Sequence, residues 1–509
     1  MSFVPKGWRV TFVYGLVLVV GVGQARAQGE KKAGEDVKAE HAQLGAGEEK
    51  ATGHTQHPDA QWFPEAAFGL FIHWGLSSVK AMNISWPMIP GRPLAARDLS
   101  AAEVERVVRE RDYNLDGKPP GITPNQYWEM AKSFDPGPAY DPDKWIRAAR
   151  EAGFTYAVMT AKHHEGFALW PSAFGDFNTK TYAKGQDLVA PFVEACRRHG
   201  LKVGLYFSGP DWRFDREYYS FLYGRAGRRN PGLPSLDADL QPRATEKNAE
   251  EIAEHQAAYA ALVRGQIEEL LTRYGRIDVL WFDGKPAVPD PESVITVERI
   301  RQLQPGIVIN PRMHGNGDYV VWEREQNLPK ERPKVEWAEF CSTWTRSWAH
   351  EEIPFRAPGN ILGKLALLRS WRVNYLLGVG PMSNGEMAPG VYENMAAVAA
   401  WMKGHRASIH GTGPLPDGET ASSPATARER VRYLFAAPKF REGAYGYPED
   451  QLPAADETLT LSGAPRPKAV VLMASGQTLP FTYVDKTLTV PVPAALRSKL
   501  VDVVQVTLP

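Results

Sequence analysis

Polar and aromatic residues recur in this sequence where short apolar, β-prone runs end. In chain order, these residues are His73, His163, His164, Tyr206, Trp281, Asp283 and Arg312. Parallel strands that alternate with helices present their carboxyl ends on one rim, so we expect these side chains to converge there. Imidazole and guanidinium groups hydrogen-bond to hydroxyls, and aromatic faces cover the C–H side of a sugar ring. The set therefore suits a polyhydroxylated ligand beside one carboxylate.

Asp283 is the strongest candidate for a chemical role. It follows the aromatic run at residues 278–282, and Gly284 after it leaves room for a ligand to approach. Hydrolysis of a glycosidic bond needs a second carboxyl group on the other side of the scissile bond. A later segment supplies the candidates Glu323, Glu325, Glu336 and Glu339. These residue types favour glycoside hydrolysis.

Two other chemistries have weaker support in the sequence. Side chains of adjacent residues on an extended strand alternate, so His163 and His164 are expected to point to opposite sides. The sequence has no H-E-x-x-H motif or spaced Cys/His set, so we expect no metal and no organic cofactor, with a metal-dependent barrel hydrolase as the alternative. Cys196 lies in an amphipathic segment and Cys341 has no evident base, so both are expected to be buried thiols.

The composition excludes several classes of protein. The 509 residues include 59 basic and 59 acidic ones, which gives a formal net charge of zero. Nucleic acids and anionic membranes select clustered positive charge, so neither is expected as the main partner. Two cysteines are too few for a disulfide scaffold or a multi-cysteine metal site.

Residues 62–411 alternate between predicted strands and helices. The predicted strands lie at 68–73, 156–160, 202–207, 278–282, 307–309 and 376–379. The predicted helices lie at 125–134, 143–152, 187–199, 249–274, 293–303, 362–374 and 392–405. Such alternation is typical of βαβ units with a parallel sheet. Because no G-x-G-x-x-G or phosphate-loop motif is present, an α/β fold of the (β/α)8 barrel type is favoured over an open nucleotide-binding sheet.

The two ends of the chain differ from this body. Short β-prone runs at 431–435, 459–461, 469–473 and 488–492 predict a small antiparallel β-sandwich, either a packing module or a sugar-binding one. We place the barrel at 59–411 and the sandwich at 412–509. Residues 28–58 contain no aromatic side chain and are expected to form a disordered linker.

Residues 1–27 are predicted to be an export signal. Lys6 and Arg9 precede an apolar run at 12–22 that is too short to span a bilayer, and Ala25-Arg26-Ala27 fits a cleavage site. A membrane anchor is the alternative. We expect a periplasmic or extracellular protein, or a lysosomal one in a eukaryote, without membrane attachment after cleavage. The sequence does not determine the oligomeric state.

Five ordered motifs give the chain a specific resemblance. They lie at 62–75, 160–172, 204–212, 280–284 and 376–385. Together they resemble the alpha-L-fucosidases of glycoside hydrolase family 29. The resemblance implies a barrel followed by a β-sandwich, and retaining hydrolysis of terminal fucosyl linkages in glycans without a metal or organic cofactor. It implies that Asp283 is the nucleophile. It also implies that the sugar contacts are His73, Trp86, His163, His164, Tyr206, Trp281 and Arg312.

The sequence departs from the family pattern at two positions. Glu165 stands where the family usually has Asp, and Ser85 precedes Trp86 where the family commonly has Glu. The second departure keeps two alternatives open: a related glycosidase for another sugar, such as a galactose-configured one, or an inactive carbohydrate-binding homologue. The retained carboxylates argue against the inactive homologue.

The acid/base residue is chosen among three glutamates. Glu325 opens the stretch Glu-Gln-x-x-Pro that resembles many family members, and we favour it. Counting onward from Asp318 selects Glu323 instead. Glu339 is the third candidate.

Overall fold

A curved parallel sheet forms the body of the protein. The computed structural model describes residues 50–51, 53–118, 121–244 and 246–509. The sheet has eight strands in the order β6-β5-β4-β3-β2-β10-β9-β8. In chain order they are β2 (Phe68–Ile72), β3 (Tyr156–Lys162), β4 (Lys202–Ser208), β5 (Val279–Asp283), β6 (Val308–Ile309), β8 (Val320–Glu323), β9 (Ala338–Thr343) and β10 (Asn374–Val379). The predicted barrel-type α/β fold is confirmed.

Helices connect these strands and cover the outside of the sheet. They are α4 (Pro142–Glu151), α5 (Val189–Arg198), α7 (Ala249–Arg273), α8 (Val297–Leu303), α9 (Pro358–Ser370) and α10 (Pro389–Ile409). The longest, α7, begins at a capping box, in which the Asn248 side chain accepts from the Glu251 amide and the Glu251 carboxylate accepts from the Asn248 amide. Within the described ranges, no helix is both long and apolar enough to cross a bilayer.

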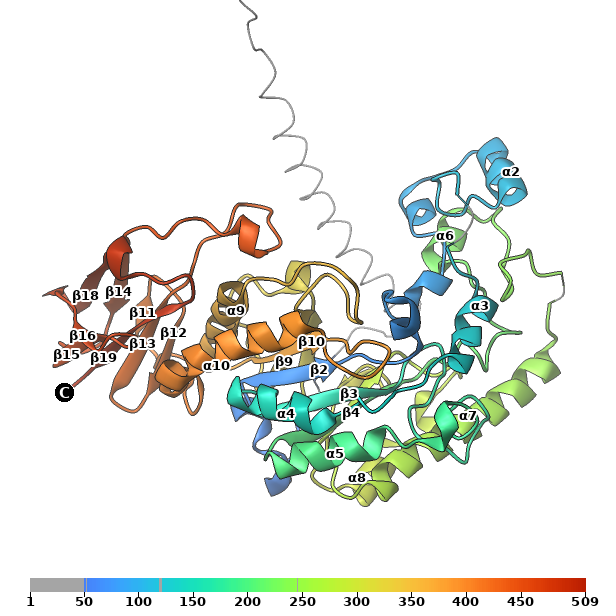
Figure 1. The fold of residues 1–509 in the computed structure, drawn as a ribbon, viewed down its shortest axis with the longest axis horizontal. Coiled ribbons are helices and arrows are strands. Elements are labelled where there is room, and N and C mark those ends of the chain that lie inside the picture. The colour runs from blue at the N-terminus through green and yellow to red at the C-terminus, as the bar shows by residue number, and fades with distance from the viewer. Residues whose placement is uncertain (1–49, 52, 119–120, 245) are drawn as a thin grey trace, which may run out of the picture.

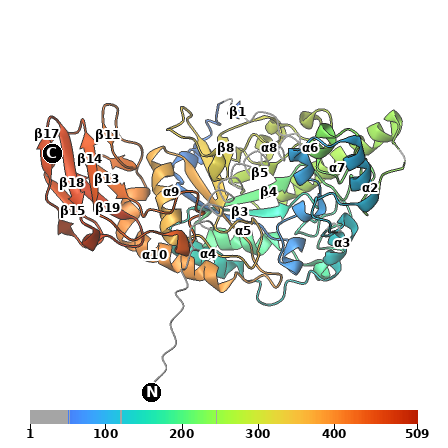
Figure 2. The same ribbon diagram turned by 90° about the horizontal axis from the view of Figure 1, so that it is seen from above.

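A second group of short helices lies at one end of the molecule. These helices are α2 (Ala101–Glu110), α3 (Pro124–Glu129) and α6 (Gly224–Arg229). Figures 1 and 2 both show α2 and α6 at the end opposite the C-terminal strands. They belong to long connections that follow β2 and β4, so these two connections extend furthest from the sheet.

The sheet encloses a small aromatic core. Alternate residues of each strand point inward, and the inward set includes Phe71, Tyr156, Tyr206 and Trp281. Gly69 makes room for it, because a Cβ there would lie 2.2 Å from the Tyr156 ring. Aromatic rings therefore fill the interior directly beneath the strand ends.

A side chain joins the two edge strands of the sheet. The Asp318 amide donates to the Ile309 carbonyl at 2.9 Å, and the Ile309 amide donates to Asp318 Oδ2 at 2.8 Å. Asp318 Oδ1 accepts from the Thr55 amide at 2.7 Å and from Arg301 at 2.6 Å. Asp318 is buried. It therefore bridges β6 and the segment entering β8 where strand pairing stops.

Two antiparallel sheets follow α10. The first contains β11 (Thr420–Ala421), β14 (Glu457–Ser462), β18 (Thr487–Val492) and β17 (Thr482–Val484). The second contains β12 (Ala425–Arg428), β13 (Val431–Ala436), β19 (Asp502–Thr507), β15 (Ala469–Leu472) and β16 (Gln477–Thr478). Residues from both sheets share one apolar core, so the predicted sandwich is confirmed.

The structure differs from the sequence-based expectations at several elements. Strands β8 and β9 were not predicted. Helix α9 ends at Ser370 rather than 374, because Asn374 begins β10 and its side chain bonds the Ala67 amide and the Phe63 carbonyl.

The N-terminal expectations fall mostly outside the described residues. The predicted signal peptide (1–27) and most of the predicted linker (28–58) lie there. Where the description begins, β1 (Lys50–Ala51) pairs with β7 (Asn316–Gly317), and Thr55 bonds Asp318. Ordered structure therefore starts before residue 59, because this segment bonds to the junction of the edge strands.

Replacing Asp318 with alanine tests this junction. Asp318→Ala removes the acceptor of two buried amides and the partner of Arg301, so we expect it to lower the free energy of unfolding by about 3 kcal/mol. Denaturant unfolding measures the loss. Asp417→Ala, at an exposed position, is the control and should change little. Equal midpoints for the two variants would contradict the role of Asp318.

Candidate active site

The carboxyl ends of the strands surround one pocket. Its lining residues are Phe71, His73, Trp86, His163, His164, Tyr206, Trp281, Asp283, Arg312, Glu323 and Trp348. Every sugar contact expected from the resemblance lies here, together with Asp283. The structure adds Phe71 and Trp348, which the sequence analysis missed. Trp348 lies in the segment after β9, which ends at Thr343, and it was missed because β9 was not predicted.

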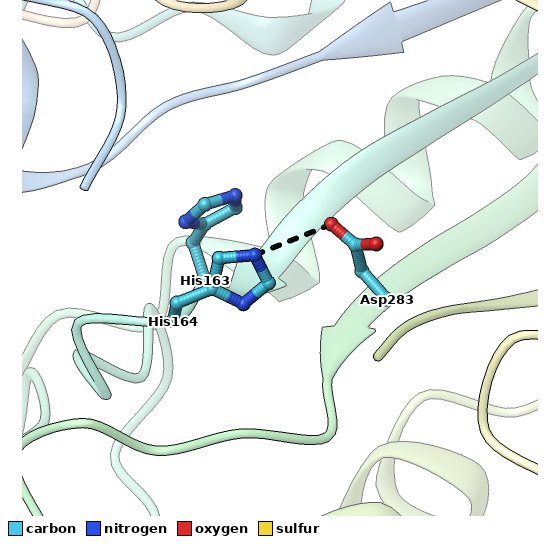
Figure 3. A group of neighbouring side chains, drawn as sticks. All are labelled: His163, His164 and Asp283. Atoms are coloured by element: carbon cyan, nitrogen blue, oxygen red, sulfur yellow. Dashed lines mark ion pairs between the residues drawn. The ribbon is translucent and has the colours of Figure 1, made fainter. Parts of the chain in front are cut away.

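Asp283 is held by donors on both of its oxygens. Arg312 Nη1 donates to Oδ1 at 2.8 Å, and the Tyr206 hydroxyl donates to Oδ2 at 2.7 Å. His164 Nε2 lies 3.5 Å from Oδ2, as the dashed line in Figure 3 marks. Arg312 and Tyr206 fix the plane of the carboxylate, and the guanidinium complements its negative charge.

Arg312 also contacts a second carboxylate. Its Nη2 donates to Glu323 Oε2 at 2.8 Å, and its guanidinium carbon lies 4.6 Å from the centre of the Trp281 ring. The Arg312 side chain is 1% exposed and that of Glu323 is 10% exposed. One buried cation therefore sits between Asp283 at the end of β5 and Glu323 at the end of β8.

Stacked rings form one side of the pocket. The Tyr206 ring lies between His163, at 5.4 Å and 9°, and Trp281, at 5.5 Å and 15°. Burial, followed by the charge of Asp283, raises the pKa of Tyr206 well above its usual value. The phenol therefore stays protonated at neutral pH and remains a donor to Asp283.

His73 is a neutral imidazole at neutral pH. Burial, and then the neighbouring His163, lower the pKa of His73 well below its usual value. Its ring centre lies 4.8 Å from that of Trp348. A neutral ring can both donate to and accept from ligand hydroxyls.

The alternation rule predicted that the adjacent histidines point to opposite sides, but the structure shows that they do not. Both line the pocket, and their ring centres are 4.1 Å apart (Figure 3). The reason is that β3 ends at Lys162, so the rule for extended strands no longer applies at 163 and 164.

His163, His164 and Asp283 bring three potential metal ligands within 4.8 Å of one another. However, Asp283 already accepts from Arg312 and Tyr206, and the guanidinium charge beside it opposes a second cation. Among the described residues, these three side chains are therefore better suited to hydrogen-bond sugar hydroxyls than to bind a metal ion.

Glu325, the favoured acid/base candidate, lies outside the pocket lining. Lys364 Nζ donates to its Oε1 at 2.6 Å, and Arg356 bonds both of its oxygens, with Nη2–Oε2 at 3.0 Å. Burial opposes the charged form, but the two cations outweigh it and hold the pKa of Glu325 well below its usual value. A carboxyl group so held has no proton to donate at neutral pH. Of the two candidates, Glu323 lines the pocket and Glu325 does not.

Glu339 and Glu336 do not line the pocket either. Glu339 is fully buried inside the barrel, where Oε1 accepts from Trp281 Nε1 at 2.8 Å and Oε2 from the Tyr156 hydroxyl at 2.6 Å. Burial raises the pKa of Glu339 to about 7. The Glu336 side chain is 80% exposed and pairs with His54. Glu339 therefore supports Trp281 from beneath.

The ion pairs of Glu325 predict a pH-dependent contribution to stability. Glu325→Gln should lower the free energy of unfolding by about 2 kcal/mol at pH 7, because Arg356 and Lys364, which are mostly buried, lose a partly buried charged partner. A lowered pKa stabilises the folded state above the unfolded pKa, so the gap to wild type should shrink as pH falls below about 4. Thermal unfolding across pH measures this, with exposed Glu331→Gln as control. A gap independent of pH would refute the assignment.

Comparison with known proteins identifies the family. The model of the family described as alpha-L-fucosidase matches residues 37–406. The tissue alpha-L-fucosidase of Rattus norvegicus is 28% identical over 372 residues, which cover 70% of this chain and 71% of that protein. The human tissue alpha-L-fucosidase is 27% identical over 377 residues, 70% of each chain.

Solved structures give the same result. The alpha-L-fucosidase isoenzyme 1 of Paenibacillus thiaminolyticus is 28% identical, with a TM-score of 0.65 over 89% of this chain and 99% of that one. A trapped covalent intermediate of a GH29 alpha-L-fucosidase from Bacteroides thetaiotaomicron shares the fold at 20% identity, with a TM-score of 0.64 over 90% of this chain and 98% of that one. Because the family model covers well over half of its length, this chain belongs to the alpha-L-fucosidase family of glycoside hydrolases, GH29.

Proposed function

We propose that this protein is a retaining exo-α-L-fucosidase that removes terminal fucosyl residues from glycans. One observation carries the proposal: Asp283 and Glu323 lie in the same pocket and share the guanidinium of Arg312. Retaining hydrolysis needs such a pair, one carboxylate as nucleophile and one carboxyl group as acid and then base. Family membership and the tissue fucosidases of rat and human support the choice of sugar.

In the first step, an Asp283 oxygen attacks the anomeric carbon. The glycosidic C–O bond breaks, and Glu323 gives its proton to the departing oxygen. In the second step, water attacks the same carbon and passes a proton to Glu323. The ester bond to Asp283 then breaks, which restores both groups.

Arg312 couples the charges of the two carboxyl groups. While Asp283 is unesterified, both carboxyl groups bond Arg312, and Arg324 Nε lies 3.7 Å from Glu323 Oε1 as a second cation. The repulsion between two carboxylates favours a proton on one of them. Once Asp283 is esterified, its side chain carries no charge. Glu323 is then the member of this pair whose negative charge Arg312 can still balance. The ionised form of Glu323, which the second step needs as base, is then stabilised.

The pocket also fits a deoxy sugar. Phe71, Trp281 and Trp348 supply apolar surface for the methyl group of fucose, and His73, His163 and His164 supply hydroxyl partners. The galactose alternative was motivated by Ser85, but Ser85 does not line the pocket. A panel of nitrophenyl glycosides tests the choice, since faster hydrolysis of the galactoside than of the fucoside would overturn it.

The organisation of the chain completes the proposal. We infer that residues 1–27 direct export to the periplasm or the exterior, that 59–411 form the catalytic domain, and that 412–509 form an accessory domain. The partner is a fucosylated oligosaccharide or glycoconjugate. N-terminal sequencing of the mature enzyme tests the cleavage site.

Replacing Asp283 tests the nucleophile. Asp283→Asn keeps the shape of the side chain and removes the charge that forms the ester, so kcat on 4-nitrophenyl α-L-fucoside should fall by about three orders of magnitude or more. Thermal unfolding checks that the variant is folded, and exposed Asp176→Asn serves as control. Near wild-type turnover by folded Asp283→Asn would remove this residue from the role.

Glu323→Ala and Glu325→Ala form a matched pair that tests the acid. A nitrophenolate leaves without protonation, whereas a sugar alkoxide does not. Glu323→Ala should therefore lose about tenfold in the first step on the nitrophenyl substrate and about a thousandfold on a fucosyl oligosaccharide. Azide, which needs no general base, should restore turnover and give fucosyl azide.

Glu325→Ala should show neither azide rescue nor dependence on the leaving group, because its carboxylate is held by Arg356 and Lys364. The reverse pattern would return the role to Glu325. If neither variant responds, the acid lies elsewhere.

A further inference from the structure

A buried serine lies behind each of the two adjacent histidines. Ser85 Oγ lies 2.6 Å from His163 Nδ1, and Ser208 Oγ lies 2.6 Å from His164 Nδ1. Both serines are fully buried, and neither lines the pocket. Each histidine is thus bonded through Nδ1 to a group the sugar cannot reach.

The partner of Ser208 fixes the direction of its hydrogen bond. The Ser208 hydroxyl donates to the Pro210 carbonyl at 2.6 Å, and a carbonyl oxygen can only accept. A hydroxyl has a single proton, so Ser208 Oγ can only accept from His164. His164 Nδ1 therefore carries a hydrogen.

Ser85 is bonded in the same way as Ser208, with a carboxylate in place of the backbone carbonyl. Its hydroxyl donates to Glu165 Oε2, and this carboxylate oxygen lies 3.5 Å from His163 Nδ1. Glu165 is 2% exposed, and the single hydroxyl proton of Ser85 is used in this bond. Ser85 Oγ therefore accepts from His163 Nδ1, which also carries a hydrogen.

The backbone of Ser85 adds an independent observation. Its φ is +22°, a conformation that residues other than glycine rarely adopt, and its amide donates to the Tyr127 hydroxyl at 3.2 Å. Strained backbone persists where surrounding contacts hold it and often marks a functional position. Here the strain places Oγ between Glu165 and His163.

We propose that Ser85 and Ser208 are positioning residues that hold both histidines as Nδ1–H tautomers. In the neutral form, the Nε2 atom of each ring then carries no hydrogen, and that of His164 lies 3.5 Å from Asp283 Oδ2. At Nε2, a neutral imidazole accepts a hydrogen bond from a sugar hydroxyl. The two histidines therefore select ligands that donate hydrogen bonds at these two positions. The proposed function supplies the identity of the ligand, whereas the tautomers follow from the protein's own contacts.

The groups that face His163 and His164 belong to several elements. His164 Nε2 lies 3.5 Å from Asp283 Oδ2, and the His163 ring stacks on Tyr206 and lies 6.2 Å from His73. Protonation of His164 at Nε2 would give a cation that donates to Asp283. With Nδ1 bonded to Ser208, Nε2 is the ring nitrogen of His164 that faces Asp283.

Nitrogen NMR of the full-length enzyme, labelled with ¹⁵N-histidine, tests the tautomers without any substrate. His163→Gln and His164→Gln variants assign the two rings among the 12 histidines. Above the titration range, we expect both rings to report a protonated Nδ1 and a bare Nε2. Ser85→Ala should shift the His163 signals toward the other tautomer, and Ser208→Ala should shift those of His164. Nε2–H signals for either ring in the wild-type enzyme would overturn the proposal.

Kinetics supply the second readout. Ser85→Ala and Ser208→Ala should each lower kcat/KM on 4-nitrophenyl α-L-fucoside by about 10- to 100-fold, because a ring of mixed tautomers meets the sugar correctly only part of the time. The control is Ser78→Ala, which removes a buried hydroxyl that donates to the Gly75 carbonyl at 2.6 Å and bonds no histidine.

The two experiments can fail separately. Losses no larger than that of Ser78→Ala would overturn the positioning role. If the enzyme does not cleave fucosides but the NMR signals are as expected, the proposed function fails and the tautomer assignment stands.

Discussion

The buried guanidinium of Arg312 is the interaction on which the active site depends. It bonds Asp283 at the end of β5 and Glu323 at the end of β8, so it holds together two strands near opposite edges of the sheet. A buried cation is tolerated only when it is paired, and here each carboxylate also needs it. Asp318 joins the same two edges one layer below. The proposed catalytic pair, Asp283 and Glu323, therefore spans the two edges of the sheet, where side-chain bonds take the place of backbone pairing.

Three nearby glutamates have different roles because their surroundings differ. Glu323 shares Arg312 with Asp283. Glu325 faces Arg356 and Lys364, and Tyr445, from the loop between β13 and β14, lies over the Arg356 guanidinium at 4.2 Å. Glu339 is enclosed in the barrel, where burial raises its pKa to about 7 and it bonds Trp281. A carboxyl group acquires its chemistry from its environment rather than from its type. Through Tyr445, the C-terminal domain contributes to the environment of the loop that follows β8.

Much of the fold follows from the sequence, because apolar runs and helical periodicity are local signals. The positions after β2, β3, β4 and β5 could be assigned to one rim for that reason. Strands β8 and β9 carry polar residues among their apolar ones, and without β9 neither Trp348 nor the interior position of Glu339 could be predicted. The choice between Glu323 and Glu325 depends on Arg312, Arg356 and Lys364, which lie 11, 31 and 39 residues from their partners. No spacing within the motif contains that information.

The two residues that depart from the family pattern, Glu165 and Ser85, contact each other in the folded protein. Glu165 stands where the family usually has Asp, and its extra methylene lets the carboxylate reach Ser85. Ser85 stands where the family commonly has Glu, and its short side chain leaves room for that carboxylate. The carboxyl group of Glu165 lies behind His163, and neither Glu165 nor Ser85 lines the pocket. Read singly, the Ser85 departure suggested a different sugar. Taken with Glu165, it forms a contact behind His163, and the pocket wall contains the histidines, aromatic rings and carboxyl groups on which the proposed hydrolysis of a fucoside depends.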